Sequence, residues 1–313
     1  MDELAVLIPC YNEGLTIEKV VGDCFKAMGN IRGKVYVYDN NSKDNTVEKA
    51  VKAGAVVRRE YEQGKGNVIR RMFREIEAKC YILIDGDDTY PAEEIPKFYH
   101  LIMNRNVDMV VGDRLSSTYF EENKRPFHNF GNRIVRKSIN WLFKSNIRDI
   151  MTGYRAFSYQ FVKSYPVVSK GFEIETDMSI FAIEYNMSVQ NKVIEYRDRP
   201  DGSESKLNTY SDGIKVLRRI FTLYRDYHPL RFFTAVALVL IILAAVIFIP
   251  AIWLPYLQSG VVQKMPTLIV TAFLVIAAIV SWYSGLILDA VLQKERRAFE
   301  FRLQLIKKMG DKR

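Results

Sequence analysis

Cysteine and histidine are scarce in this chain of 313 residues, which contains three of each. Cys10, Cys24 and Cys80 have none of the spacings that build zinc sites, so a structural zinc centre is not expected. We expect the cysteines to be reduced thiols, because we expect the folded part of the chain to lie in the cytoplasm. The histidines have no partner evident in the sequence, and we assign them no role.

A nucleic-acid-binding module, an internal repeat and a low-complexity tract are also missing. The chain is nevertheless basic, with a net charge of +9 and a pI near 9.3. Such an excess suits nucleic acid, anionic lipid or a phosphorylated substrate. Lipid headgroups explain it well, because much of it flanks two apolar segments, and we expect no nucleic-acid partner. Met1 leads directly into a strand-like run, so we expect no signal peptide.

Charge is absent from two long stretches, residues 232–254 and 266–288. Each has about the ~20 apolar residues that an α-helix needs to cross a bilayer. Two buried core helices are the alternative, but core helices are usually shorter and amphipathic. The connecting residues 255–265 carry a single charge, Lys264. We therefore expect a hairpin of two transmembrane helices.

Basic residues lie on the two outer flanks of this hairpin. They are Arg218, Arg219, Arg225 and Arg231 before it, and Lys294, Arg296, Arg297, Arg302, Lys307, Lys308, Lys312 and Arg313 after it. The positive-inside rule then places both termini in the cytoplasm, in a multi-pass protein of the plasma membrane. If residues 209–231 form a helix, apolar residues lie on one side of it and arginines on the other. This pattern indicates an interfacial helix. A helix packed on the folded domain is the alternative.

The first 114 residues alternate strand-like and helix-like segments. Strand-like runs begin at Leu4, Lys34, Ala55, Cys80 and Val107, and segments of helical periodicity separate most of them. This alternation is typical of a parallel α/β sheet, in which ligands bind beyond the carboxyl ends of the strands. Polar residues follow the strand-like runs at those ends: Asn12, Glu13, Asp39, Asp85, Asp87, Asp88, Asp113 and Arg114.

Three carboxylates follow one of these strands directly, in the stretch "YILIDGDDTYP" that begins at Tyr81. Like charges this close repel each other, and a bound cation would offset the repulsion. Carboxylates separated by one glycine suit Mg²⁺ or Mn²⁺, which also leave positions for phosphate oxygens. A D-x-D alone is a weak signal, because acidic solvated turns are common.

Eight ordered motifs strengthen this interpretation. They are "PCYNE" (residues 9–13), "DNNSKDNT" (39–46), "GKG" (64–66), "DGD" (85–87), "GDR" (112–114), "DIMTGYRAF" (149–157), "FEIETDM" (172–178) and "RPDGSESKL" (199–207). Together they resemble the family 2 glycosyltransferases of GT-A fold, most closely the polyprenyl-phosphate group that includes dolichol-phosphate mannose synthase and its bacterial relatives. The sequence departs from the pattern at Asn40, Asn41 and Thr89, where the family has Asp, Gly and often Gln.

The resemblance implies roles for particular residues. The nucleotide would contact Pro9, Tyr11, Glu13, Asp39, Lys65 and Asp85, with Asp39 accepting a hydrogen bond from uracil. Asp85 and Asp87 would hold the metal, and Asp149 is the candidate base. The acceptor phosphate would contact Arg133, Arg155, Arg199 and Lys206. The alternative interpretation of these basic residues is ordinary surface charge. Asp113, Arg114, Glu173 and Glu175 would touch the sugar or support other residues.

The acceptor implied by the resemblance is a polyprenyl phosphate. A phosphate monoester carries roughly −1.5 to −2 charges at neutral pH, so it needs little help from a base. We expect inverting transfer of a hexose from a UDP-sugar, UDP-glucose or UDP-N-acetylglucosamine, to undecaprenyl phosphate. A homo-oligomer, a tetramer by resemblance, is also expected.

The expected organisation is a GT-A catalytic domain (1–208), a juxtamembrane helix (209–231), two transmembrane helices (232–288) and a basic tail (289–313). Two other functions are weighed. A processive polysaccharide synthase would carry a Q-x-x-R-W motif and more spans, which this sequence lacks. A non-catalytic scaffold that binds nucleotide sugar would have a broken D-x-D, whereas Asp85 and Asp87 are both present.

Overall fold

A computed structural model describes residues 1–117, 139–144, 146–200 and 209–311, with the backbone alone for residues 209–214 and 311. The chain forms two compact units. The first comprises residues 1–220 and 301–313, and the second comprises residues 221–300.

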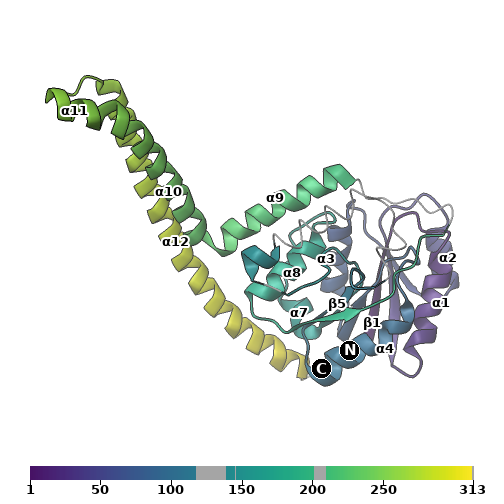
Figure 1. Ribbon diagram of the computed structural model, residues 1–313. Coiled ribbons are helices and arrows are strands. Elements are labelled where there is room, and N and C mark those ends of the chain that lie inside the picture. The colour runs from purple at the N-terminus through teal and green to yellow at the C-terminus, as the bar shows by residue number, and fades with distance from the viewer. Residues whose placement is uncertain (118–138, 145, 201–208, 312–313) are drawn as a thin grey trace. The chain divides into compact units, whose positions relative to one another are not determined.

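The first unit is built on a seven-stranded sheet of order β3-β2-β1-β4-β6-β5-β7 (Figure 1). Its strands are β1 (Asp2–Cys10), β2 (Gly33–Asp39), β3 (Val56–Arg59), β4 (Ala78–Leu83), β5 (Met109–Asp113), β6 (Arg155–Ser158) and β7 (Val189–Val193). Strand β6 runs antiparallel to β4 and β5, and every other neighbouring pair is parallel. The expected mostly parallel α/β sheet is thus confirmed.

Helices cover both faces of this sheet. They are α1 (Ile17–Met28), α2 (Thr46–Lys52), α3 (Lys65–Glu75), α4 (Ile95–Arg105), α7 (Tyr159–Ser164) and α8 (Ile174–Glu184), with a 3₁₀ turn η1 at Ala92–Glu94. Leu4, Val6 and Ile8 alternate along β1 and form one core with α1 and α4. On the opposite face, Phe73 of α3 packs edge-on against Tyr81 and Phe157, with ring centroids 6.4 and 5.7 Å apart. Both faces of the central strands are therefore buried, which explains their nearly continuous apolar runs.

The strand order brings the polar strand ends together. Strands β2, β1 and β4 are adjacent and parallel, so their carboxyl ends lie along one edge of the sheet. The register pairs Cys10 with Asp39 at that edge. Neither β6 nor β7 was foreseen from the sequence, because neither RAFS nor VQNKV forms the apolar run by which the other strands were identified.

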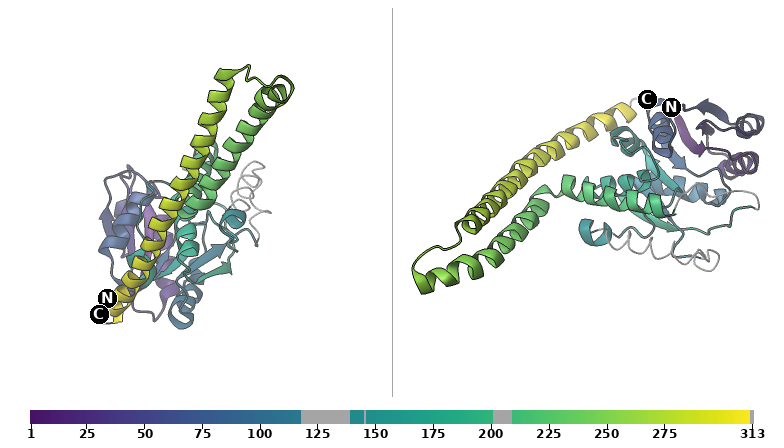
Figure 2. Two further views of the ribbon diagram at one scale, coloured as in Figure 1. Left: turned by 90° about the vertical axis from the view of Figure 1, so that its left-hand side faces the viewer. Right: turned by 90° about the horizontal axis from the view of Figure 1, so that it is seen from above.

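The second unit consists of the end of α9 (Thr209–Tyr227), α10 (Pro229–Phe248), a π-helical segment η2 (Ile249–Trp253), α11 (Leu254–Ser259) and most of α12 (Met265–Asp311). Helices α10 and α12 run side by side in both views of Figure 2. Gly285 of α12 makes this approach possible, because a Cβ there would lie 2.9 Å from Cβ of Phe233.

Two helical stretches, Pro229–Ser259 and Met265–Gly310, each contain an 18-residue segment apolar enough to cross a membrane, with mean hydropathies of 3.2 and 2.2. The structure differs from expectation at two places. Helix continues through Ser259, so the connection is shorter than residues 255–265, and the basic tail is part of α12. Residues 286–309 contain neither glycine nor proline, so nothing in the sequence interrupts the helix.

Candidate active site

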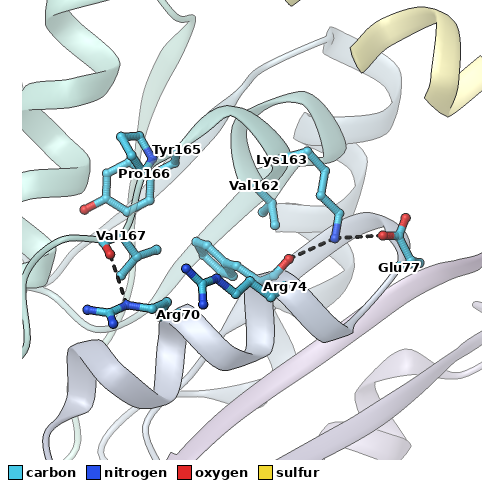
Figure 3. A pocket seen from close by; sticks show the side chains of 9 residues that line it. Arg70, Arg74, Glu77, Val162, Lys163, Tyr165, Pro166 and Val167 are labelled. Carbon is cyan, nitrogen blue, oxygen red and sulfur yellow. Dashed lines mark hydrogen bonds and ion pairs between the residues drawn. The ribbon is translucent and has the colours of Figure 1, made fainter. Parts of the chain in front are cut away.

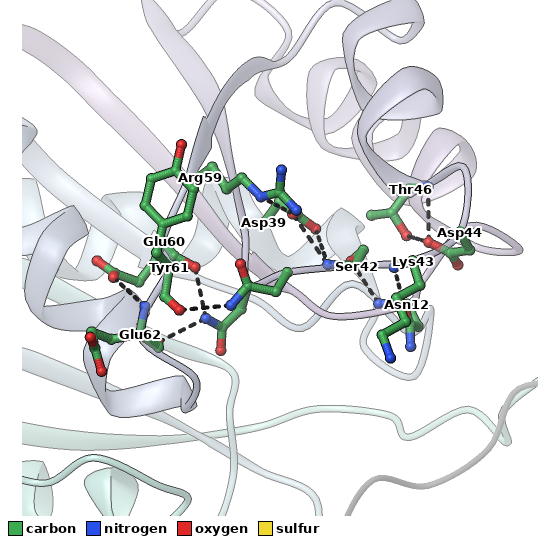
Figure 4. A network of polar contacts seen from close by, with 12 residues as sticks. Asn12, Asp39, Ser42, Lys43, Asp44, Thr46, Arg59, Glu60, Tyr61 and Glu62 are labelled. Carbon is green, nitrogen blue, oxygen red and sulfur yellow. Dashed lines mark hydrogen bonds and ion pairs between the residues drawn. The ribbon is translucent and has the colours of Figure 1, made fainter.

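Asp39 is held in a network that joins the ends of β1 and β2 (Figure 4). It is 1% exposed, and both its carboxylate oxygens accept from the backbone N–H of Ser42, at 3.1 and 3.3 Å. Arg59 Nε lies 3.6 Å from Asp39 Oδ2. Asn12, in a left-handed conformation, accepts from the N–H of Lys43 and donates its own N–H to Ser42 Oγ, each at 2.8 Å. The two loops therefore fix the position of the Asp39 carboxylate.

The loop after β1 is fastened to the start of α2. The backbone N–H of Glu13 donates to Thr46 Oγ1 at 2.9 Å, and that of Gly14 donates to Asp44 Oδ2 at 2.9 Å. These bonds hold a loop in which Pro9 and Tyr11 are half-buried and Glu13 is buried. The three residues expected to shape a nucleotide pocket thus lie at the expected strand end.

The two departures from the family motif after β2 have physical explanations. Asn40 is buried, and its amide donates to the carbonyls of Glu60 and Glu62, both at 2.9 Å, while its oxygen accepts from Gly64 N–H at 2.7 Å. A carboxylate could not donate either of the first two bonds. Asn41 has a φ of 69°, a left-handed conformation that asparagine tolerates better than most residues.

Lys65 lies between two carboxylates. Its Nζ is 2.6 Å from Asp85 Oδ1 and 2.8 Å from Glu175 Oε1. Burial lowers the pKa of Lys65, but the nearby carboxylates of Asp85 and Glu175 outweigh this effect. They raise the pKa of Lys65 above that of an ordinary lysine. Burial raises the pKa of Glu175, against the opposing pull of Lys65. The other oxygen of Glu175, Oε2, is buried and has no hydrogen-bond partner among the residues that the structure describes.

The D-x-D segment is shaped by its neighbours. A Cβ on Gly153 would lie 2.3 Å from Asp85 Oδ2, so a larger residue there would displace this carboxylate. Asp87 is 4% exposed, and its Oδ1 accepts from Thr89 Oγ1 at 2.6 Å and from Thr89 N–H at 3.2 Å. Its Oδ2 accepts from Arg199 Nη2 at 2.5 Å. Each carboxylate of the segment is thus paired with a cation of the chain.

These residues fit a divalent ion that takes its remaining ligands from phosphate and water. Mg²⁺ is usually bound by one or two carboxylates plus substrate phosphates, and Asp85 and Asp87 supply two. Within the described residues, no three His, Cys, Asp or Glu side chains are grouped to hold a metal by themselves. Thr89 takes the position where the family often has Gln, and here it orients Asp87.

Asp149 forms a buried ion pair with Arg114. Arg114 Nε lies 2.7 Å from Oδ2, Nη2 lies 3.1 Å from Oδ1, and the Arg114 backbone N–H donates to Oδ2 at 3.2 Å. The guanidinium also lies over the rings of Tyr90 and Tyr196, 5.9 and 5.6 Å from their centroids. Asp113 is fully buried, with Arg148 Nη1 3.9 Å from its Oδ2.

The structure gives the candidate acceptor residues different positions. Arg155 is 0% exposed and donates to the carbonyls of Ile150 and Thr152, at 2.6 and 3.0 Å, and to Ser179 Oγ at 2.9 Å. Burial lowers its pKa to about 10. This enclosed position argues against contact between Arg155 and a phosphate, and favours a role in holding the loop after Asp149.

The remaining candidate residues for binding the acceptor or the sugar also differ in their positions. Arg199 reaches the D-x-D segment, whereas Arg133 and Lys206 lie outside the described residues. Glu173 folds back to accept from the N–H of Gly171 at 3.1 Å.

One feature of the site was missed from the sequence. Asp177 of α8 accepts from Arg219 of α9 through both oxygens, at 2.7 and 2.8 Å, and from Ser169 Oγ. A carboxylate in the "FEIETDM" motif was the available signal, but its partner lies 42 residues away in the sequence. The pair fastens α9 to α8 within the first unit.

A cavity of about 300 Å³ lies elsewhere, between α3 and α7 (Figure 3). Arg70, Arg74 and Lys163 line it, but none of the strand-end residues does. Lys163 donates to the carbonyls of Phe73 and Ile76, both at 2.8 Å, at the end of α3. Its charge therefore caps a helix, and the cavity does not compete with the strand-end site as a catalytic centre.

Comparison with known proteins agrees with this geometry. The family model described as "Glycosyl transferase family 2" matches residues 5–165. Glycosyltransferase AglJ of Haloferax volcanii is 31% identical over 236 residues, which cover 75% of this chain and 76% of that protein. Dolichyl-phosphate hexose transferase of the same organism is 29% identical over 219 residues, covering 70% of this chain and 92% of that protein.

A crystal structure of glucosyl-3-phosphoglycerate synthase from Mycobacterium tuberculosis, in complex with Mn²⁺, UDP-glucose and phosphoglyceric acid, superposes with a TM-score of 0.55. The two chains are 18% identical, and the superposition covers 72% of this chain and 79% of the other. At this identity the likeness concerns the fold, and it confirms the GT-A class expected from the motifs.

Proposed function

The chain belongs to glycosyl transferase family 2 and is a glycosyltransferase, and we propose that it transfers one hexose from a UDP-sugar to a polyprenyl phosphate. UDP-glucose and UDP-N-acetylglucosamine are the proposed donors, and undecaprenyl phosphate is the proposed acceptor. One observation carries the proposal: Asp39 ends β2, Asp85 and Asp87 follow β4, and both strands run parallel to β1, which lies between them. The names of the two Haloferax relatives and the two apolar helices support a lipid acceptor.

The donor side of the site is assigned to the ends of β1, β2 and β4. Asp39, fixed by Ser42, accepts a hydrogen bond from the uracil edge. Pro9, Tyr11 and Glu13 form the wall of the nucleoside pocket, and Lys65 faces the diphosphate. Asp85 and Asp87 would hold Mg²⁺ or Mn²⁺, which as a Lewis acid stabilises charge on the leaving nucleoside diphosphate. The Mn²⁺ and UDP-glucose named for the mycobacterial structure support this assignment.

The acceptor phosphate supplies its own nucleophilic oxygen, because a phosphate monoester is already anionic at neutral pH. In-line attack on the anomeric carbon inverts its configuration without a covalent sugar–enzyme intermediate. Arg114 donates to both oxygens of Asp149, so the carboxylate and the guanidinium hold each other in a fixed geometry. We assign Asp149 to holding Arg114 in place, and Arg199 to phosphate binding.

The proposed setting is the plasma membrane. Helices α10 and α12 would cross the bilayer, and the distribution of Lys and Arg would place the first unit and both termini in the cytoplasm. Residues 209–231 would lie along the membrane surface, and the enzyme would act as a homo-oligomer.

Mass spectrometry of the lipid product tests the proposed function. The purified full-length chain is incubated with undecaprenyl phosphate, Mn²⁺ and a panel of UDP- and GDP-sugars. We expect one donor to give a lipid phosphate heavier by a single sugar residue. A lipid that carries a growing chain of sugars would instead indicate a processive synthase. No product with any donor, despite measurable UDP binding, would indicate a non-catalytic scaffold.

A further inference from the structure

Arg199 binds the second carboxylate of the D-x-D segment, that of Asp87. Its Nη2 lies 2.5 Å from Asp87 Oδ2, and the side chains of Arg199 and Asp87 are 26% and 6% exposed. The other oxygen of Asp87 accepts from Thr89. Both oxygens of Asp87 are therefore engaged by groups of the chain itself.

Lys65, the cation at the other carboxylate of the segment, has a second anchor. It binds Asp85 and also Glu175, so it keeps a buried carboxylate partner if Asp85 takes another ligand. An ion at Asp85 would therefore leave Lys65 in place.

Hydrogen bonds hold the backbone just before Arg199. The side chain of Arg199 can therefore move while that backbone stays in place. The backbone N–H of Ile194 donates to Asp113 O at 3.2 Å, and that of Arg197 donates to Thr89 O at 3.0 Å. The Arg197 side chain pairs with Glu93, with Nη2 3.1 Å from each carboxylate oxygen. Arg199 follows two residues later, so its guanidinium can leave Asp87 without displacing the anchored segment.

We infer that Arg199 is a positioning residue that exchanges Asp87 for a phosphate when a divalent ion reaches the D-x-D segment. The inference rests on the proposed function, in which Asp85 and Asp87 bind that ion. An ion at Asp87 repels the guanidinium, because like charges a few ångströms apart interact strongly in a partly buried site. A displaced guanidinium is well suited to phosphate, which it binds with two parallel hydrogen bonds.

The exchange couples metal binding to phosphate binding. Without phosphate, Arg199 and the ion compete for Asp87, so the ion binds weakly. With phosphate, the guanidinium has a new partner and the competition is relieved. By linkage, the metal must strengthen phosphate binding by the same factor as phosphate strengthens metal binding. The phosphate is either the donor diphosphate or the acceptor monoester, and the experiment separates these two sources.

The test measures Mn²⁺ binding by electron paramagnetic resonance, on the full-length chain in detergent. Wild type, Arg199→Gln, Arg199→Lys and the neighbouring control Arg197→Gln are each titrated alone, with UDP and with a short-chain polyprenyl phosphate. We expect Arg199→Gln to bind Mn²⁺ alone more tightly than wild type, on the order of tenfold, because the competing charge is gone. Arg199→Lys and Arg197→Gln should stay close to wild type.

The two ligand arms identify the phosphate. If Arg199 moves to the donor, UDP tightens Mn²⁺ binding less in Arg199→Gln than in wild type; if it moves to the acceptor, the same loss appears with the lipid phosphate. Unchanged or weaker Mn²⁺ binding by Arg199→Gln alone, in a protein of wild-type Tm, would overturn the exchange. If wild type binds no Mn²⁺ even with UDP, the metal assignment of the proposed function fails, and the exchange fails with it.

Discussion

The guanidinium of Arg114 donates hydrogen bonds to both carboxylate oxygens of Asp149, although 35 residues separate Arg114 and Asp149 in the sequence. The pair is nearly enclosed, with side chains 10% and 1% exposed. Removing one partner of a buried ion pair leaves the other charge without compensation. We therefore expect the pair to support the structure around the site.

This relationship predicts the effect of Asp149→Asn. We expect a loss of about 3–5 kcal/mol in the free energy of unfolding, seen as a lower Tm together with reduced activity. Replacing both residues, as Arg114→Met with Asp149→Leu, should recover much of the Tm because no buried charge is left unpaired. If Asp149 is instead a general base, Asp149→Asn would abolish transfer and leave the Tm unchanged.

A second prediction concerns acid stability. Burial raises the pKa of Glu75, but hydrogen bonds from Arg71, Arg58 and Tyr38 outweigh this effect and lower it from 4.5 to about 2. The contacts lie at 2.7, 2.5 and 2.8 Å. A carboxylate with a lowered pKa stabilises the folded state above its ordinary pKa, and this contribution is lost as the pH falls toward the folded value.

Wild type should therefore have a higher Tm than Glu75→Gln at pH 7, and the difference should shrink as the pH falls from 4.5 to about 2. Thermal unfolding monitored by circular dichroism across this range checks the prediction. A Tm difference that stays constant with pH would show that the carboxylate charge is not responsible.

The sequence was sufficient to predict where polar strand ends gather, but not how their side chains pair. Apolar runs followed by acids identified the ends of β1, β2 and β4, because a buried strand and its polar end are local patterns. The partners of Asp149, Lys65 and Asp87 could not be read, since each lies 20 to 112 residues away and is chosen by tertiary packing.

Arg155 is the clearest example of a side chain whose surroundings could not be predicted from the sequence. An arginine in a family motif suggests phosphate binding, yet its guanidinium is fully buried against backbone carbonyls. The length of α12 was also missed, because its charged residues suggested a separate tail although residues 286–309 contain neither glycine nor proline.

The nucleotide assignment predicts a selective effect of Asp39→Ala. UDP affinity should fall by about one to two factors of ten, the effect expected for a buried hydrogen bond to a charged group, roughly 1.5–3 kcal/mol. The control Glu62→Ala changes an exposed acid near the same edge and should leave UDP binding unchanged. Calorimetry with UDP measures both. Equal affinity for Asp39→Ala and wild type would remove Asp39 from the nucleotide pocket.

Topology is testable by cysteine labelling with an impermeant reagent. The native Cys10, Cys24 and Cys80 are buried, and burial raises the pKa of Cys24 to about 12, so they should react little. Val261→Cys, at an exposed position between the apolar helices, should label from outside the cell. Lys308→Cys should label only after the membrane is opened. The reverse pattern would contradict the hairpin orientation.

The central claim is that a metal held by the D-x-D segment supports sugar transfer to a lipid phosphate. Asp87→Asn removes the charge of the second carboxylate of that segment. Asp88→Asn is a matched control, because Asp88 pairs with the exposed Lys19 and has a φ of 61°, which asparagine tolerates.

The decisive measurement is the incorporation of radiolabelled sugar into undecaprenyl phosphate by the full-length chain, with the productive donor and Mn²⁺ or Mg²⁺. We predict transfer by wild type and by Asp88→Asn, no transfer by Asp87→Asn at wild-type Tm, and loss of wild-type activity in EDTA that added metal restores. Full activity in EDTA, or wild-type turnover by Asp87→Asn, would contradict the account.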